Sequence, residues 1–293
     1  MKVIGGQTEF GPLRRVLLKS PAAAFPGQPL LDTQWKELGY HKRPALQRAT
    51  EEFEAFRGLL EQLGATVQTF PASTGTGLDS LYVRDASVVT DDGMILCRMG
   101  KDARQGEPGA QEAGFLDMDI PILGRIGGKG RLEGGDVLWL DEETLAVGRG
   151  YRTNDEGIRQ LRGFMDTRIE SILTVPLPHW KGPSDVFHLM SVVSPLDRDL
   201  ALVYSPLLPV PFREELIRRG VSLVEVHPEE FPTMGCNVLA VAPRVCVALD
   251  GNPHTRRRLE ASGVEVHTYR GEEISMPGDG GPTCLTRPTR RGS

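Results

Sequence analysis

Residues 133–149 read EGGDVLWLDEETLAVGR. Two apolar runs, VLWL and TLAV, lie on either side of the short acidic segment DEE. Apolar runs of this length around a polar turn predict a β-hairpin. The two glycines let the backbone turn sharply before the first strand. We therefore expect the carboxylates of Glu133 and Asp136 to lie where that strand begins.

The same hairpin unit recurs along the chain. Its other copies are RDASVVTDDGMILCRM (84–99), HLMSVVSPLDRDLALVY (188–204) and GCNVLAVAPRVCVALD (235–250). A half copy, TCLTRP (283–288), lacks its second strand, which RRVLLKS (14–20) near the N-terminus could supply. The copies begin at intervals of roughly 50 residues, a spacing typical of an internal structural repeat.

Helix-like segments separate the hairpins, and short strand signals such as TVQTFP, ESILTVP, SLVEVHP and VEVHTY follow them. These segments, at 43–65, 154–166, 211–220 and 253–263, each end at or near a glycine, as helices often do. We predict a mixed α/β fold of about five ββαβ modules in a cyclic array, forming a single domain over residues 1–293. The Gly- and Pro-rich segment 20–32 is expected to be a surface loop or a lid.

A cyclic array would bring together the residues that head each first strand. These residues are Asp85, Glu133, His188, Asn237 and Cys284. They comprise two carboxylates, an imidazole, an amide and a thiol, a set able to support catalysis.

Of the four cysteines, only Cys284 lies outside an apolar strand-like run, since it follows the Gly-rich segment GDGGPT. The cysteine spacing predicts neither a disulfide framework nor a zinc site. Cys284 is therefore the candidate nucleophile, although a cysteine of the core is the alternative. His188 is its candidate acid/base partner, with a buried structural histidine as the alternative.

The carboxylates predict the kind of substrate. Asp85 and Glu133 near a thiol and an imidazole suit a planar cation, because a guanidinium presents a rigid fork of N–H donors. Asp136 is a further candidate for substrate binding. Arg98 and Arg152 could bind a substrate carboxylate or be ordinary surface cations.

Charge and composition narrow the partners. With 34 basic and 39 acidic residues the net charge is −5, which gives no basic footprint for nucleic acid or an anionic membrane. The N-terminal sequence lacks the apolar core of a signal peptide, and no stretch has the length of a membrane span. We expect a cytoplasmic protein with a small-molecule partner. The sequence leaves open the oligomeric state, including a homodimer.

Six motifs together resemble those of the guanidino-group-modifying superfamily, which includes dimethylarginine dimethylaminohydrolase, arginine deiminase and the amidinotransferases. They are DSLYVRD (79–85), LEGGDVLWL (132–140), GRGYRTND (148–155), FHLM (187–190), GCNV (235–238) and GGPTCLTRP (280–288). The resemblance implies a five-bladed α/β propeller with pseudo-fivefold symmetry, and its compact size is closest to dimethylargininase. It also implies that no metal or organic cofactor is needed.

The resemblance further implies roles for individual residues. Asp85 and Glu133 would bind the guanidinium, His188 would transfer protons, and Cys284 would form a covalent adduct. The positions that match substrate-carboxylate ligands are Arg98 and Arg152, and Asp79 matches an acidic position nearby. The expected reaction converts N-methylated arginine to citrulline and an amine.

Two positions depart from the family patterns. Arg84 stands where dimethylargininases commonly have Glu, and Met190 stands where arginine deiminases have a second Asp. An apolar side chain at position 190 would tolerate an alkylated nitrogen. The alternatives are an arginine deiminase-type hydrolase of arginine or another guanidine, an amidinotransferase, and a non-catalytic propeller that binds arginine-like ligands.

Overall fold

The computed structural model describes residues 4–25, 27–165, 168–185 and 187–292. Within these residues the chain forms five three-stranded sheets. The strands are β1 (Leu13–Lys19), β2 (Thr66–Phe70), β3 (Ser87–Val89), β4 (Met94–Leu96), β5 (Ile122–Arg125), β6 (Val137–Trp139), β7 (Thr144–Arg149), β8 (Ser171–Pro176), β9 (Val193–Asp197), β10 (Leu200–Val203), β11 (Ser222–Glu225), β12 (Leu239–Ala242), β13 (Val245–Leu249), β14 (Glu265–Tyr269) and β15 (Arg287–Arg291).

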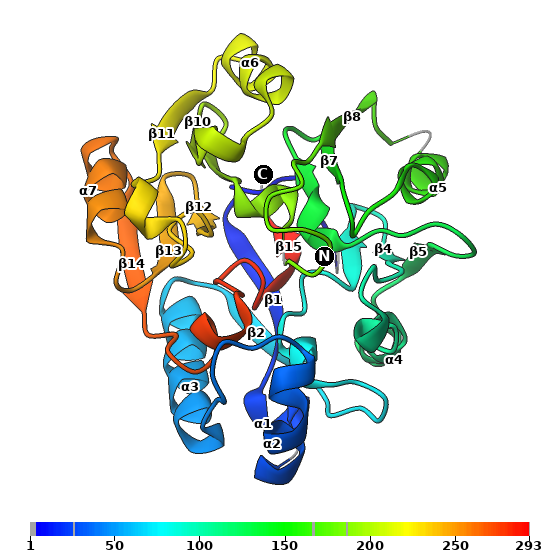
Figure 1. Ribbon diagram of the computed structural model, residues 1–293. Helices are drawn as coiled ribbons and strands as arrows, with labels where there is room; N and C mark the ends of the chain where they lie inside the picture. The colour runs from blue at the N-terminus through cyan, green and yellow to red at the C-terminus, as the bar shows by residue number, and fades with distance from the viewer. Residues whose placement is uncertain (1–3, 26, 166–167, 186, 293) are drawn as a thin grey trace.

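All five sheets have the same topology. The middle strand pairs antiparallel with its hairpin partner and parallel with the strand that follows the next helix, as in β6-β7-β8. The other sheets are β3-β4-β5, β9-β10-β11, β12-β13-β14 and β15-β1-β2. The last sheet joins strands from opposite ends of the sequence, because β1 pairs with β15. The structure thus confirms the predicted repeat, and Figure 1 shows the five sheets around a common centre.

The helices of the described residues are α1 (Pro21–Ala24), α2 (Gln28–Glu37), α3 (Leu46–Gln62), α4 (Glu107–Asp117), α5 (Asp155–Met165), α6 (Val210–Arg218) and α7 (Pro253–Ala261). In Figure 1 the helices α3 to α7 lie at the periphery of the molecule. Four of these five fall within the segments predicted to be helical, and α4 was not predicted. None of the helices in the described part of the chain is long and apolar enough to cross a membrane.

Each module buries the apolar face of its helix against neighbouring sheets. In α3 the residues Phe53, Phe56 and Leu60 recur at helical spacing and pack in one cluster with apolar residues of β1 and β13. In α5, Ile158 and Leu161 pack with β6 and β7 in the same way. These contacts fix the strand starts relative to one another, so residues that head the strands have defined positions.

Buried charges lie where the two ends of the sequence meet. The guanidinium Nη2 of Arg84 contacts Glu9 Oε2 at 2.6 Å, and both side chains are almost fully buried. Arg287 Nη2 donates to the carbonyl of Arg84 at 2.8 Å. Arg291 Nη1 donates to the carbonyls of Gly11 and Ala240. Arg84 therefore ties the segment before β3 to the segments around β1 and β15.

Candidate active site

The five residues that head the modules precede equivalent strands. Asp85 comes just before β3, and Asn237 just before β12. Glu133 and His188 are each followed by one 3-10 turn, Gly134–Asp136 and Leu189–Ser191, which lead into β6 and β9. Cys284 comes just before β15. The repeat register inferred from the sequence therefore agrees with the structure.

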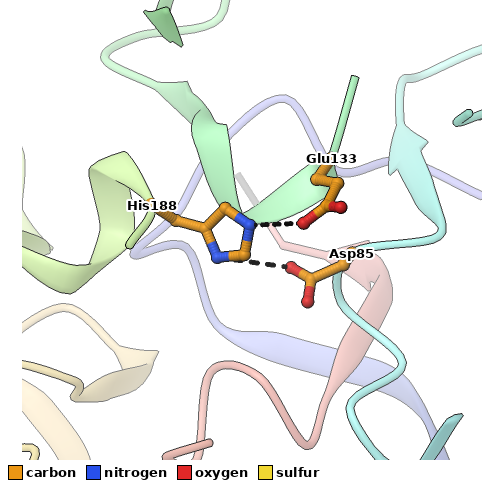
Figure 2. Close-up of side chains that lie close together, drawn as sticks. All are labelled: Asp85, Glu133 and His188. Atoms are coloured by element: carbon orange, nitrogen blue, oxygen red, sulfur yellow. Dashed lines mark hydrogen bonds and ion pairs between the residues drawn. The ribbon is translucent and has the colours of Figure 1, made fainter. Parts of the chain in front are cut away.

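The imidazole of His188 lies between two carboxylates, as Figure 2 shows. Nε2 lies 2.7 Å from Glu133 Oε2, and Nδ1 lies 3.9 Å from Asp85 Oδ1. Burial opposes the charged form of the imidazole, but the charges of Asp85, Asp136 and Glu133 outweigh burial and raise the pKa of His188 to about 9. His188 is thus an imidazolium at neutral pH, able to donate a proton.

Glu133 is fixed from three directions. Its Oε1 accepts the backbone N–H of Gly100 at 2.7 Å and lies 3.5 Å from Arg152 Nη1, while Oε2 faces His188. Burial alone would raise the pKa of this carboxyl group. The hydrogen bond from His188, together with the charges of His188 and Arg152, reverses the effect and lowers the pKa of Glu133 to about 2. Glu133 therefore holds the imidazole in place as an anion.

Asp85 is held by Arg104, a residue that the sequence analysis did not identify. Arg104 Nη1 contacts Asp85 Oδ2 at 2.6 Å, and Gly135 N–H donates to Asp85 Oδ1 at 3.1 Å. Arg104 also makes two hydrogen bonds to Glu107, at 2.9 and 2.8 Å. The bidentate carboxylate of Glu107 orients the guanidinium of Arg104 toward Asp85. In the sequence this pair at spacing i, i+3 looks like an ordinary surface pair.

Cys284 lies at the end of a glycine-rich loop packed on the ring of Tyr82. A Cβ on Gly280 would lie 2.0 Å from Tyr82 Cε1, so only glycine allows this close approach. Asn237 Nδ2 donates to Cys284 Sγ at 3.2 Å, and Asn237 Oδ1 accepts the N–H of Thr283 at 3.0 Å. The head residue of the preceding module thereby holds the thiol.

Burial and the nearby Asp85 charge raise the pKa of the Cys284 thiol to about 11, despite the hydrogen bond from Asn237. The other three cysteines, Cys97, Cys236 and Cys246, are fully buried. Only Cys284 is partly exposed, and it borders the cavity that His188 also lines. The free site therefore holds a neutral thiol beside an imidazolium, and a cation entering the cavity would favour the thiolate.

The cavity beside Cys284 has a volume of about 30 Å³. Its charged lining comprises Asp79, Asp85, Lys101, Arg104, Arg152, His188 and Asp279. Its remaining walls are Leu38, Gly39, Tyr82, Gly278, Gly280 and Cys284. The end of α2 and the loop before Cys284 therefore close it. A cavity of this size holds about one water molecule, so a larger ligand requires these walls to separate.

Three residues expected near a substrate lie elsewhere. Arg98 donates to the carbonyl of Gly130 at 3.4 Å, and its side chain does not line the cavity. Asp136 is buried behind the site, where its carboxylate accepts from Thr153 Oγ1 and from the N–H of Leu189. Met190 packs in the apolar core and borders a separate small cavity. Its side chain therefore offers no explanation for tolerance of an alkylated nitrogen.

Lys101 was also missed, although the repeat contains a signal for it. Arg98 and Arg149 end equivalent middle-strand segments, and three residues later stand Lys101 and Arg152. Both of these cations line the cavity. Comparing the second strands of the hairpins, as well as the first, would have identified Lys101.

The atoms of Asp85, Glu133 and His188 that could ligate a metal lie within 4.8 Å of one another. Each of them already has a partner in the protein, including Arg104 on Asp85 and the Gly100 N–H on Glu133. The raised pKa of His188 also disfavours the neutral imidazole that a metal ligand needs. The contacts favour proton transfer at this site over metal binding.

Comparison with known proteins places this geometry in context. A family model described as arginine deiminase matches residues 79–213 and 211–291. The Bacillus subtilis protein YkgA, described as uncharacterized, is 26% identical over 98% of this chain and 95% of its own length. Arginine deiminases of Mycobacterium marinum and Rhodococcus erythropolis are each 29% identical over 72% of this chain. The match covers 60% of the length of each of these deiminases.

Solved structures share the fold at low sequence identity. DDAH from Pseudomonas aeruginosa, complexed with citrulline, has a TM-score of 0.76 at 21% identity and covers 94% of this chain and 98% of its own. The amidinotransferase SxtG from Microseira wollei has a TM-score of 0.79 at 16% identity, covering 99% and 98%. The N-terminal domain of ArgZ, a cyanobacterial arginine dihydrolase, has a TM-score of 0.78 at 20% identity, covering 93% and 97%.

Proposed function

The chain belongs to the arginine deiminase family, and from that premise we propose that it hydrolyses a C–N bond of a guanidino substrate through a covalent adduct on Cys284. Membership confirms the resemblance that the sequence motifs indicated. One observation carries the proposal: the thiol shares a cavity with His188, whose imidazole lies between Asp85 and Glu133. A nucleophile, a proton donor and anions that attract a cation are thereby combined.

In the proposed first step, the Cys284 thiolate forms a bond to the guanidinium carbon. The C–N bond to the leaving nitrogen then breaks, and that nitrogen departs as an amine with the proton of His188. The positive charge of the substrate stabilises the thiolate, whose proton is lost on binding. The product of this step is a thiouronium adduct on Cys284 and a neutral imidazole.

In the second step, His188 accepts a proton from water as the water oxygen adds to the adduct carbon. The C–S bond breaks, the thiolate is restored, and a ureido compound leaves. The balance is one guanidine and one water for one ureido product and one amine. Glu133 keeps His188 oriented throughout, because its carboxylate stays bonded to Nε2 and to Gly100.

The leaving amine identifies the finer substrate. Dimethylargininase-like turnover would release methylamine or dimethylamine from N-methylated arginine and yield citrulline, which is the activity the sequence favoured. Turnover of arginine would release ammonia and is favoured by the family model. The buried position of Met190 gives it no part in this choice.

The proposed architecture is the five-bladed α/β propeller, formed as one catalytic domain. Its support is the shared topology of the five sheets and the likeness in fold to DDAH and SxtG. In such an array the catalytic groups come from three different modules around the centre.

The reaction is tested by incubating the protein with a panel of guanidines and identifying products by mass spectrometry. The panel comprises arginine, monomethylarginine, asymmetric dimethylarginine, agmatine and 4-guanidinobutyrate. We expect a ureido product and, on rapid quenching, a covalent adduct on the wild-type chain. Cys284→Ala should lower turnover by at least about a thousandfold, as removal of a catalytic nucleophile does.

Cys246→Ala is the matched control, because Cys246 is a buried cysteine of β13 that does not line the cavity beside Cys284. It should retain activity. Turnover by the Cys284→Ala variant at the wild-type rate would exclude the covalent mechanism. Product formation only when an acceptor amine is added would identify a transferase instead.

A further inference from the structure

Two cations, Lys101 and Arg152, line the cavity at equivalent positions of adjacent modules. Lys101 stands three residues after Arg98, which follows the middle strand β4. In the same way Arg152 stands three residues after Arg149, the last residue of the middle strand β7. The repeat therefore presents a pair of positive groups to the same space. Arg152 lies next to Glu133, whereas Lys101 lies next to Asp79.

The ammonium of Lys101 occupies two acceptors at one end of the cavity. Its Nζ lies 2.7 Å from Asp79 Oδ2 and 2.8 Å from the carbonyl oxygen of Leu38. The side chain is only 22% exposed. A carboxylate and a carbonyl that converge in this way form a site for an ammonium group. In this protein a lysine already fills that site.

The other carboxylates of the cavity are engaged as well. Asp85 pairs with Arg104, and Asp279 lies 2.7 Å from His41 Nε2. A second cationic group on a substrate would therefore lie near the positive charges of Lys101 and Arg152. The carboxylates that line the cavity are already paired and would not neutralise it. The guanidinium end differs, because the Cys284 thiolate supplies a new negative charge when the thiol ionises.

Both cations have donors to spare. Lys101 uses two of its three N–H groups for Asp79 and Leu38. Arg152 donates to the carbonyl of Asp185 at 3.3 Å through Nη2 and faces Glu133 through Nη1. A guanidinium has five N–H groups, so Arg152 can also bind an anion.

We propose that Lys101 selects an ω-guanidino carboxylic acid that lacks a second ammonium group, with Arg152 as the other ligand of the substrate carboxylate. This assignment rests on the proposed function. Lys101 acts in two ways, because it fills the place of a substrate ammonium and presents a donor to a carboxylate. Arginine retains the carboxylate but brings an unpaired ammonium, and agmatine brings only the ammonium.

The test compares kcat/KM for 4-guanidinobutyrate, arginine and agmatine. We expect the wild-type chain to prefer 4-guanidinobutyrate over agmatine by at least about a hundredfold and over arginine by at least about tenfold. Lys101→Met keeps the length of the side chain without its charge. This variant should reduce the preference over agmatine at least about tenfold, because Asp79 and the Leu38 carbonyl become available to an ammonium.

Lys129→Met is the matched control, because Lys129 is exposed and outside the cavity. It should leave all three values unchanged, and Lys101→Arg should keep the order of substrates. A wild-type preference for agmatine or arginine, or an unchanged ratio in Lys101→Met, would overturn the assignment while leaving the proposed reaction intact.

Binding separates the two proposals if turnover fails. The affinities of the Cys284→Ala chain for 4-guanidinobutyrate and agmatine can be measured by calorimetry with and without the Lys101→Met change. Absence of any ureido product in the wild-type chain would reject the proposed reaction. The ratio of the two affinities would still decide the role of Lys101. The proposal requires 4-guanidinobutyrate to bind more tightly than agmatine when Lys101 is present, and this preference to be lost in Lys101→Met.

Discussion

At the scale of single residues, the site is defined by where two protons reside. The neighbouring carboxylates raise the pKa of His188 to about 9, and burial raises that of Cys284 to about 11. At neutral pH both groups are therefore protonated in the free protein. The reactive form, a Cys284 thiolate beside a His188 imidazolium, has one proton fewer. The free protein forms it only by releasing a proton to solvent.

This arrangement predicts the pH dependence of the reaction. The value of kcat/KM should rise roughly tenfold per pH unit from pH 6 and level off near pH 9, because the fraction of free protein that has lost one proton rises in that way. The profile of kcat should level off at lower pH, since a bound cation favours the thiolate. A kcat/KM that stays constant between pH 6 and 8 would contradict the assigned protonation states.

Residues with distinctive neighbours could be found from the sequence, and residues with common neighbours could not. Cys284 follows a glycine-rich segment, whereas the other cysteines lie in apolar runs. Arg104 looks like an ordinary surface cation in the sequence, and Lys101 stands out only when the second strands of the hairpins are compared. Their function depends on Asp79 and Asp85, about 20 residues away along the chain, and only the fold brings those carboxylates to them.

At the scale of elements, the loop before Cys284 depends on close packing. Gly280 lies against the ring of Tyr82, and a Cβ on Gly281 would lie 2.5 Å from Asn237 Cγ. The loop therefore cannot accept side chains without moving away from the residues that position the thiol. Backbone contact of this kind fixes the nucleophile more rigidly than a loop exposed to solvent would.

Gly280→Ala should lower kcat/KM by at least about tenfold, because the added methyl displaces the loop from Tyr82 and misplaces the thiol. Steady-state kinetics and circular dichroism would measure the activity and the fold. Gly109→Ala is the matched control. Its methyl would have nothing within 4 Å, and at this exposed position of α4 it should stabilise the protein by about 0.5–1 kcal/mol. Equal activity of the two variants would show that loop packing is unimportant.

The elements predicted well were those with a clear period. The hairpins have apolar runs around polar turns, and α5 has buried residues at helical spacing. The helix α4 was missed because its sequence, EPGAQEAGFLD, contains proline and two glycines that weaken the helical signal. The segment 20–32 was expected to be a loop for the same reason. Pro21 and Pro29 lie in the first turns of α1 and α2, where a helix tolerates them.

At the scale of the whole molecule, the two ends of the sequence meet at a group of buried charges. Glu9 faces Arg84, and burial together with Arg84 lowers the pKa of Arg287 to about 9. Burial likewise lowers the pKa of Arg291 to about 10. Glu9 contacts Arg84, and its charge also acts on Arg287 and Arg291, opposing the effect of burial on the pKa of both.

Glu9→Gln should destabilise the protein by about 3–5 kcal/mol, because it leaves the buried guanidinium of Arg84 without an anion. Chemical unfolding at pH 7 measures this change. Glu260→Gln is the matched control, since it breaks the exposed pair with Arg256 and should change the free energy of unfolding by less than about 1 kcal/mol. Similar losses in the free energy of unfolding of the two variants would show that Glu9 has no special part in joining the two ends of the sequence.

The arrangement of the whole chain was accessible from the sequence because a half module at one end had a matching strand at the other. The pairing of β15 with β1 confirms that expectation. The central charges were not predictable, because Glu9 and Arg84 are 75 positions apart and Glu9 lies in no recognisable motif.

The pairing of β1 with β15 has a consequence for the protein during its synthesis. The ribosome makes β1 before every other described strand and β15 after them, and Cys284 emerges just ahead of β15. A growing chain can thus assemble the modules that carry Asp85, Glu133 and His188 while it still lacks the thiol. Reactivity toward guanidines then arises only after the residues from Cys284 to β15 have been added.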